Sequence, residues 1–314
     1  MNLRHLRTFV AIADAGGVAR ATERVHLSQP AVSRQILALE AELGVRLFDR
    51  VGRRIRLTSE GEDMLQRSRR LLAEAESLSE RARVLTAGQT GLLRIGATPQ
   101  VIEHLLTAFL PRYRRRFPGV EIHLLEDASG RLATYLDQGD VHLAQMPTSD
   151  GRFPSRPVYP IHLLAVVPRG HRLSRRRTLD VTELAEEPLL VLRRHWLARQ
   201  WIEAAYRVAH VRPPILFESS APQTLIALTG AEYGIAVVPS NVVIAQRSVR
   251  PVPLVLRGAS LGAWTSLAWH PQRFLPPYAQ KFVDEYVAFA RRNNPGQAVI
   301  RHAPPLPRPS ETAA

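Results

Sequence analysis

The fold is decided by the stretch Leu27-Ser28-Gln29-Pro30-Ala31-Val32-Ser33-Arg34-Gln35-Ile36. Ser28 is a favourable N-cap residue, and its hydroxyl is expected to accept a backbone N–H of the first helical turn. Pro30 falls in that turn, where the N–H that proline lacks would have no helical partner anyway. Apolar side chains then recur at helical spacing until Gly44 ends the helix; they are Val32, Ile36, Leu39 and Leu43. The stretch therefore predicts an amphipathic helix that begins after Ser28.

The opposite face of this helix carries hydrogen-bonding side chains near its N-terminus, at Gln29, Ser33 and Arg34. Glutamine can bond adenine with two hydrogen bonds, arginine can do the same to guanine, and serine bonds either base. A recognition helix in a DNA major groove presents its N-terminal residues to base edges. The predicted DNA contacts are Ser28, Gln29, Pro30, Ser33 and Arg34.

Segments on both sides fit a winged helix-turn-helix. An upstream helix is expected to end at Gly16-Gly17, and a short helix follows with Ala21 and Val25 facing inward. The apolar face of the upstream helix consists of Leu3, Leu6, Phe9, Val10 and Ala13. Downstream, residues 45–50 and 55–57 are short apolar runs around a basic tip, which predicts a two-stranded wing. The wing would contact the phosphates or the minor groove of DNA through Arg50, Arg53 and Arg54.

These motifs resemble the winged helix-turn-helix of the LysR-type transcriptional regulators. The resemblance runs almost continuously from Phe9 to Gly61. It is carried by Ser28-Gln29-Pro30-Ala31-Val32-Ser33, Leu39-Glu40, Leu43-Gly44-Val45-Arg46-Leu47-Phe48-Asp49-Arg50 and Leu57-Thr58-Ser59-Glu60-Gly61. The chain departs from the family at Gly17-Val18-Ala19-Arg20, where the family more often has Ser followed by an aromatic residue or Leu. This departure affects the cap of the second helix and not the base-reading face.

A long helix is predicted after the wing. Thr58 or Ser59 would cap it, and Ser59 and Glu62 have the spacing of a capping box. Its apolar seam follows alternating steps of four and three: Met64, Ser68, Leu71, Ala75, Leu78, Ala82 and Leu85. The helix either packs on its own domain or pairs with the same helix of a second copy. Because the residues between the seam positions are mostly Arg and Glu, we favour pairing, as the resemblance does. A homodimer or homotetramer would read an imperfect palindrome in double-stranded DNA.

The second half of the chain alternates predicted strands and helices in two series, which indicates a mostly parallel α/β sheet in each of two lobes. Glu218-Ser219-Ser220 and residues 231–239 resemble the second-lobe signature of the LysR effector domain, whose architecture is like that of a periplasmic binding protein. The predicted fold class is therefore α+β and multi-domain, with a disordered, proline-rich tail. The predicted ranges are 1–58 (winged helix-turn-helix), 59–88 (linker helix), 92–300 (effector-binding domain, with lobe I at 92–162 and 268–292 and lobe II at 163–267) and 301–314 (tail).

Ligands in such clefts meet the carboxyl ends of strands and the N-termini of the following helices. By the resemblance, the effector loops of this chain contain Thr98, Gln100, Thr148, Ser219 and Ser220. Each hydroxyl could instead be a simple helix cap. The run Arg193-Arg194-His195 also follows a predicted strand, and its alternative is a solvated loop. If one of these three faces the cleft, the effector should be an organic anion, so Arg193 joins the predicted effector-binding set.

Composition limits the remaining possibilities. The formal net charge is +14, but residues 1–88 carry only 15 arginines against 11 acidic residues, so most of the excess lies outside the predicted DNA-binding end. A positive surface supports nucleic-acid binding without establishing it. The chain has no cysteine, which excludes disulfides and thiolate metal sites and fits a reducing cytoplasm. No apolar run approaches the ~20 residues of a membrane span.

No catalytic motif stands out. The eleven histidines include no His-Glu-x-x-His pair, and no glycine-flanked serine elbow or phosphate-binding Gly-Lys loop is present. The sequence therefore predicts a cytoplasmic transcription regulator, not an enzyme, with no cofactor and no metal, whose partners are DNA, a small-molecule effector and RNA polymerase. Two alternatives remain open: an architectural DNA-binding protein that senses no ligand, and an enzyme with a DNA-binding head.

Overall fold

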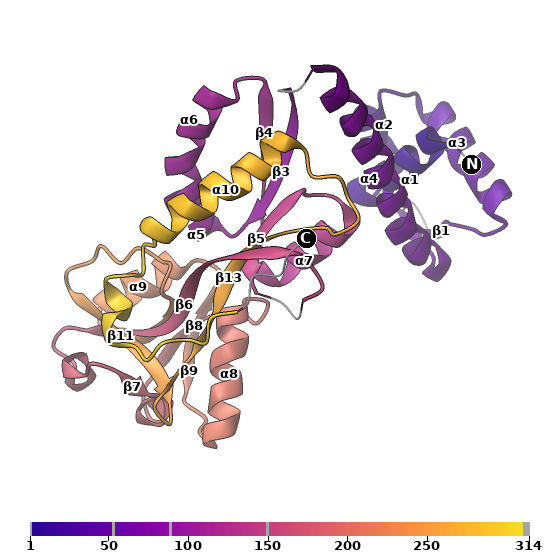
Figure 1. Ribbon diagram of the computed structural model, residues 1–314. Helices are drawn as coiled ribbons and strands as arrows, with labels where there is room; N and C mark the ends of the chain where they lie inside the picture. Colours follow the sequence, from indigo (N-terminus) through magenta and orange to yellow (C-terminus); the bar gives the residue numbers. More distant parts are fainter. Residues whose placement is uncertain (1, 52–53, 88–89, 149–150, 310–314) are drawn as a thin grey trace. The chain divides into compact units, whose positions relative to one another are not determined.

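A computed structural model describes residues 2–51, 54–87, 90–148 and 151–309 of the chain (Figure 1). The chain divides into two compact units. The first consists of residues 1–88 with the short segments 137–140 and 272–274, and the second of the remaining residues. None of the helices within the described segments combines the length and the apolar character needed to cross a bilayer.

The first unit begins with three helices and a two-stranded antiparallel hairpin. Their bounds are α1 Leu3–Ala15, α2 Val18–Val25, α3 Gln29–Leu43, β1 Phe48–Val51 and β2 Arg54–Leu57. Phe9, Ala21, Val32 and Leu39 are fully buried together with Leu47 at the start of the wing. Helix α3 ends at Gly44 in the left-handed conformation, as its sequence predicts. The expected N-terminal winged helix-turn-helix is confirmed by the described residues of this unit.

One local expectation in this unit is wrong. Ser28 occupies the N-cap position of α3, but its side chain makes no capping hydrogen bond. Pro30 is the second residue of the helix, so one of the two backbone N–H groups that an N-cap side chain can reach is missing. The Ser28 side chain is instead exposed.

Helix α4 spans Ser59–Ala87, and its first turn is capped by Thr58. The Thr58 hydroxyl oxygen accepts a hydrogen bond from the Gly61 backbone N–H at 2.8 Å and donates to the Arg46 carbonyl at 2.7 Å. Ser59 donates its hydroxyl to the neighbouring Glu60 carboxylate, so the capping box expected from Ser59 and Glu62 does not form. Thr58 therefore joins the end of the wing to the start of the long helix.

The second unit contains the strands that form the two expected lobes. In lobe I, β3 lies between β4 and β5 in a parallel arrangement, and β13 pairs antiparallel with β5. In lobe II, β8 lies parallel between β9 and β10. The strand bounds are β3 Gly91–Ala97, β4 Val120–Glu126, β5 Leu143–Pro147, β6 Ser155–Pro168, β7 Leu179–Asp180, β8 Leu189–Leu192, β9 Ile215–Ser219, β10 Ile235–Pro239, β11 Val249–Leu256, β12 Ala259–Ser260 and β13 Gly262–Trp269.

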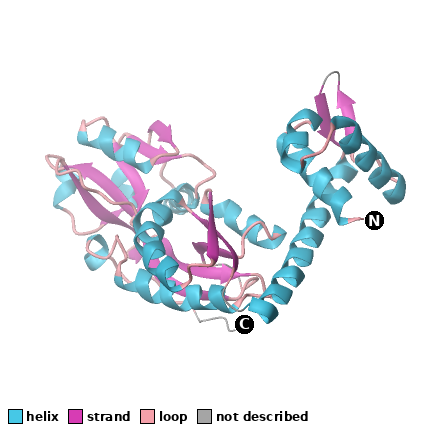
Figure 2. Cartoon of the chain, turned by 90° about the horizontal axis from the view of Figure 1, so that it is seen from above, coloured by secondary structure: helices cyan, strands magenta, loops and turns pink. Residues whose placement is uncertain are grey.

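Helices flank the strands of both lobes (Figure 2). The helix predicted from Pro99 to Arg116 is continuous, but its middle is a π-helical segment. Aromatic side chains on α10 and on this helix, Phe282, Tyr286 and Phe109 among them, pack against one another. The helix bounds are α5 Pro99–Val101, η1 Ile102–Leu106, α6 Thr107–Arg116, α7 Ser129–Gln138, η2 Arg172–Arg175, η3 Val181–Leu184, α8 Leu197–Ala209, α9 Pro222–Gly230, α10 Pro277–Arg292 and η4 Val299–His302.

The chain crosses between the lobes along β6 and again before β13. Residues 155–162 of β6 pair with β13 in lobe I, and residues 163–168 pair with β10 and β11 in lobe II. The first crossing lies at the predicted position, near residue 162. The second lies before Gly262, because β13 pairs with β5 of lobe I, and not near residue 267 as expected. An apolar run predicts a strand, but it does not indicate which sheet the strand joins.

The expected disorder of the tail does not hold for residues 301–309. The Ser260 hydroxyl donates to the Pro304 carbonyl at 2.6 Å, and the indole N–H of Trp264 donates to the Leu306 carbonyl at 3.3 Å. The guanidinium of Arg308 lies over the Trp264 ring at 5.6 Å from its centroid. The prolines reduce the conformational freedom of this segment in the unfolded chain. Ordering it therefore costs less conformational entropy than ordering a segment without prolines.

His162 lies at the crossing in β6 and is buried. Its backbone N–H donates to the Ser240 hydroxyl at 3.1 Å, and its carbonyl accepts from the Ser240 N–H at 2.8 Å. Its ring atom Nδ1 has no hydrogen-bond partner in the part of the chain that the structure describes. Burial lowers the pKa of His162 below its ordinary value, so the folded protein holds a neutral ring there.

We therefore predict that the second unit loses stability on acidification through His162. As the pH falls through the ordinary histidine pKa, about 6.5, the unfolded chain takes up a proton that the folded His162 resists. Stability from the neutral ring is fully present above that pH and is lost below it. The unfolding free energy of the His162→Gln variant should fall less between about pH 7.5 and pH 5.5 than that of the wild type. Equal slopes in chemical denaturation would contradict this role.

Candidate functional site

The predicted recognition residues share one exposed face of α3. Ser28, Gln29, Pro30, Ser33 and Arg34 are all exposed, whereas Val32, Ile36 and Leu39 on the opposite face are buried. The half-buried Gln35 accepts a hydrogen bond from the Thr8 hydroxyl of α1 at 2.6 Å. The structure thus separates a base-accessible surface from the side that anchors α3.

The wing is tied to α3 by Glu40. Its carboxylate oxygen Oε1 accepts the backbone N–H of Leu47 at 2.7 Å and that of Phe48 at 3.3 Å. Two donors in the turn before the wing are thereby satisfied by one side chain on the helix. Arg50 lies in β1 and Arg54 in β2, while Arg53 lies outside the described residues. Phosphate or minor-groove contact by these arginines stays a prediction.

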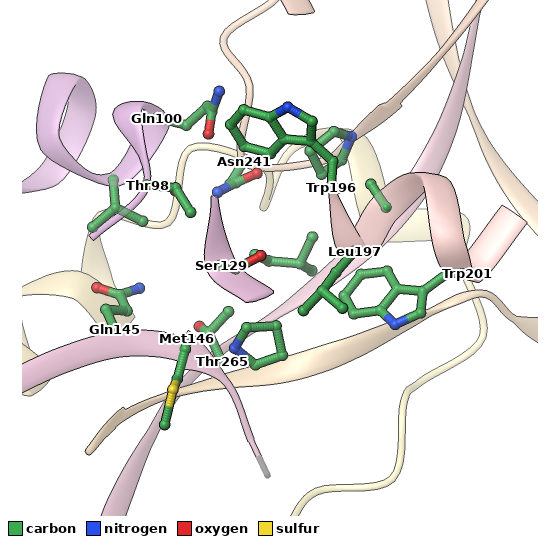
Figure 3. Close-up of a pocket in the computed structure, with 15 residues that line it drawn as sticks. Thr98, Gln100, Ser129, Gln145, Met146, Trp196, Leu197, Trp201, Asn241 and Thr265 are labelled. Atoms are coloured by element: carbon green, nitrogen blue, oxygen red, sulfur yellow. The ribbon is translucent and has the colours of Figure 1, made fainter. Parts of the chain in front are cut away.

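A cavity between the two lobes, here called the inner cavity, lies at the carboxyl ends of the central strands (Figure 3). The space between its lining atoms is about 450 Å³ when the part open to solvent is included, and about 40 Å³ of it is wide enough for the centre of a water molecule. Thr98 and Gln100 reach it from lobe I, and Trp196 and Asn241 reach it from lobe II. Its lining consists of Thr98, Gln100, Val101, Ser129, Gln145, Met146, Pro147, Ile161, Trp196, Leu197, Ala198, Trp201, Pro239, Asn241 and Thr265.

A second, outer cavity shares Gln100 and Trp196 with the inner one and is larger, about 910 Å³ including open solvent. Three carboxylates line it: Glu103, Glu126 and Asp127. Its other lining residues are Pro99, Ala128, His195, Ser220, Ala221, Pro222, Gln223 and Val242.

The structure brings three of the six predicted effector residues to these cavities. Thr98 and Gln100 line the inner cavity, and Gln100 and Ser220 line the outer one. Ser219 lines neither: its hydroxyl oxygen accepts the Ala221 backbone N–H at 3.1 Å, which is the capping alternative. Thr148 also lies outside both linings, and its hydroxyl bonds that of Ser266 at 2.6 Å.

Arg193 is exposed and lines neither cavity, and the same holds for Arg194. His195 alone of this run lines the outer cavity, whose lining also contains three carboxylates. The expectation of an organic anion depended on a cationic group in the cleft. No Lys, Arg or His lines the inner cavity, whereas His195 belongs to the lining of the outer one. An anion in the inner cavity would therefore have no cationic side chain beside it. Local sequence does not show on which side of a strand end a side chain lies.

Sequence reasoning missed most of the lining, including Ser129, Gln145, Trp196, Trp201, Asn241 and Thr265. One signal was present: Gln145 interrupts the apolar strand 143–147. Its Oε1 accepts the Tyr286 hydroxyl at 2.5 Å, and its Nε2 donates to the Tyr159 hydroxyl at 3.1 Å. Burial raises the pKa of Tyr159 far above its ordinary value, so the phenol is neutral. Gln145, which lines the inner cavity, is thus hydrogen-bonded to two tyrosines behind it.

Three residues that line the inner cavity each carry a buried polar atom that the described residues do not satisfy: Thr98 Oγ1, Trp196 Nε1 and Asn241 Oδ1. Buried polar groups in native proteins are normally hydrogen-bonded, and leaving one unpaired costs about 1–3 kcal/mol. Unpaired atoms from both lobes that meet in one cavity indicate a site for a polar ligand. No group of three potential metal-binding side chains occurs within the described segments.

Comparison with known proteins agrees with this architecture. Residues 3–62 match the bacterial regulatory helix-turn-helix protein family, lysR type, and residues 86–291 match the LysR substrate binding domain. The chain is 31% identical to the uncharacterized HTH-type transcriptional regulator YnfL of Escherichia coli over 90% of this chain and 96% of that protein. It is 31% identical to the HTH-type transcriptional regulator AlsR of Bacillus subtilis over 77% and 81%.

Solved structures give the same result. A full-length OxyR from Pseudomonas aeruginosa superposes with a TM-score of 0.69 at 23% identity, covering 94% of this chain and 99% of that one. Full-length CbnR in complex with its target DNA superposes with a TM-score of 0.62 at 26% identity, covering 92% and 100%. The chain therefore belongs to the LysR family and is a DNA-binding transcriptional regulator with a substrate-binding domain, not an enzyme.

Proposed function

We propose that a small-molecule effector binds in the inner cavity and thereby changes how the regulator occupies promoter DNA. The observation that carries this proposal is the convergence of unpaired buried polar atoms from both lobes, Thr98 on one side and Trp196 and Asn241 on the other. A ligand that bonds both lobes binds a closed arrangement better than an open one. Such differential affinity is what a ligand needs to shift a conformational equilibrium.

On DNA, the exposed face of α3 is proposed to read bases through Gln29, Ser33 and Arg34, with Ser28 and Pro30 at its edge. Two copies joined along α4, as a homodimer or as half of a homotetramer, would address an imperfect palindrome in the bacterial cytoplasm. Contact with RNA polymerase would turn altered DNA occupancy into altered transcription. The family resemblance supports these partners.

The test is a footprint on the DNA upstream of the protein's own gene, with and without metabolites suggested by neighbouring genes. We expect protection over several helical turns that shortens, or loses a hypersensitive bend, with one metabolite. A diffuse, salt-sensitive footprint that no metabolite changes would favour an architectural protein instead.

Arg34→Ala should weaken binding to the specific site about 10- to 100-fold at fixed salt, because one bidentate base contact contributes roughly 1–3 kcal/mol of discrimination. Arg34 is exposed, so the variant should unfold at the wild-type temperature. The matched control is Arg67→Ala, which removes the same charge from an exposed pair with Asp63 on α4. Equal losses in both variants would show that Arg34 contributes only charge.

A further inference from the structure

The lining of the inner cavity is electrically neutral. None of its fifteen residues is an Asp, Glu, Lys, Arg or His. A full charge moved from water into such surroundings loses its hydration and finds no charged side chain to offset that loss, which disfavours binding. The lining thus selects against ligands that are ionised at the buried end.

Two indole rings contribute to the walls. Trp196 is the N-cap residue of α8, and Trp201 lies in the same helix. Both line the cavity, and Figure 3 shows the Trp201 ring beside Leu197 and the Trp196 ring on the side of Gln100. Ile161, Met146 and Pro239 add further apolar surface. Flat aromatic walls favour a planar, apolar ligand body, which can stack on a ring or meet its edge.

The unpaired atoms define the polar pattern of the ligand. The indole N–H of Trp196 can only donate, so it calls for an acceptor on the ligand. Asn241 Oδ1 can only accept, and its amide nitrogen is used by Tyr159, so it calls for a donor. Thr98 Oγ1 can do either. A neutral group with both an acceptor and a donor, such as an amide, satisfies this set.

Two further features bear on charge. The first turn of α8 adjoins the cavity through Leu197 and Ala198, and a helix N-terminus carries about half a positive charge. That partial charge suits an acceptor atom of a neutral ligand. The outer cavity, however, is lined by Glu103, Glu126 and Asp127 together with His195. Among the described residues, an arginine, Arg131, pairs with Asp127 at 3.2 Å. Carboxylates in the neighbouring cavity oppose the approach of an anion on that side.

We propose that the effector is an uncharged molecule with a flat apolar body, whose polar group both accepts and donates hydrogen bonds. The acceptor bonds the Trp196 indole N–H, and the donor bonds Asn241 Oδ1. The inference rests on the proposed function, since it takes the inner cavity as the effector site. It replaces the organic anion expected from the sequence.

Three probes of nearly identical shape test the charge. Benzamide is neutral, benzoate is an anion and benzamidine is a cation at neutral pH. Isothermal titration of the full-length protein should show benzamide binding roughly tenfold or more tightly than either charged probe. Benzoate or benzamidine binding as tightly as benzamide would overturn the inference, and so would the absence of binding by all three at about 10 mM.

Variants locate the binding. Thr98→Val keeps the side-chain shape and removes the hydroxyl, which caps no helix, so the fold should persist. Benzamide affinity should fall roughly 3- to 30-fold in this variant. The matched control is Thr224→Val, at an exposed position outside both cavities, which should bind as the wild type does.

The two failures are distinguishable. If benzoate binds most tightly and Thr98→Val weakens it, the site stands and the uncharged class is wrong. If the probes bind but neither Thr98→Val nor Trp196→Phe changes their affinity, the inner cavity is not their site, and the inference fails together with the proposed effector site. If none of the probes binds but a metabolite still alters the footprint, only the ligand class is wrong.

Discussion

Gly61→Ala is expected to abolish DNA binding by unfolding the winged helix-turn-helix. A Cβ at Gly61 would lie 2.1 Å from the Leu47 carbonyl oxygen and 3.1 Å from Thr58 Oγ1. Neither atom can move freely, because Leu47 is held by Glu40 at 2.7 Å and by the Thr58 N–H at 3.1 Å. We expect a loss of about 3 kcal/mol or more, a large fraction of the stability of a small domain.

The sign of the change in unfolding free energy caused by Gly61→Ala distinguishes between two physical effects. Gly61 lies in the first turn of α4, and helix propensity alone predicts that alanine stabilises a helix by up to about 1 kcal/mol. The close approach to Leu47 predicts the opposite sign. Thermal unfolding followed by circular dichroism, with a gel-shift assay at the same temperature, decides between them.

Gly17→Ala is the matched control for this substitution. An added Cβ at Gly17 meets no atom of the described residues within 4 Å, and Gly17 precedes α2 in the same unit. Its cost should stay below about 1 kcal/mol, the usual effect at an N-cap position. If both variants bind DNA like the wild type, the contact between Gly61 and Leu47 does not constrain the wing.

The recognition helix could be predicted because its determinants are local. The spacing of Val32, Ile36 and Leu39 fixes which face is buried, and Gly44 ends the helix. What local reasoning missed was Glu40, whose carboxylate bonds the turn seven and eight residues later. The role of Gly61 was also hidden, since it depends on the path of the chain at Leu47.

The cavity between the lobes was predictable only in part, for a related reason. Thr98 and Gln100 follow a strand directly, and the rule that ligands meet strand ends locates them. Asn241 and Thr265 lie far along the chain, and they reach the same cavity because β6 and β13 cross between the lobes. Register and crossing depend on long-range pairing, which residue spacing does not encode.

From its sequence, the apolar seam of the linker helix could pack either on its own domain or on the same helix of a second copy. Leu71 and Leu78 lie two turns apart on α4 and are 46% and 71% exposed within the chain. Single exposed leucines are common, but two on one seam of a long helix favour a partner helix. The exposure therefore supports the proposed homodimer.

Replacing both Leu71 and Leu78 with glutamate should make the protein monomeric, because opposing carboxylates would meet in the seam. Each monomer keeps a folded recognition helix but loses the linked second half-site. Affinity for the full palindrome should then fall about 100-fold or more, as expected when bivalent binding is lost. Sedimentation and gel-shift titration at fixed salt measure the two effects.

Ser79→Glu is the control, since Ser79 is exposed on α4 beside the seam and the substitution adds one glutamate to the same helix outside the seam. It should remain dimeric and bind the palindrome nearly as the wild type does. The double variant should also keep the wild-type affinity for an isolated half-site, which distinguishes it from Gly61→Ala, where the DNA-binding unit itself is lost. A double variant that stays dimeric would show that α4 is not the interface. The seam leucines would then need another partner, because their own unit does not bury them.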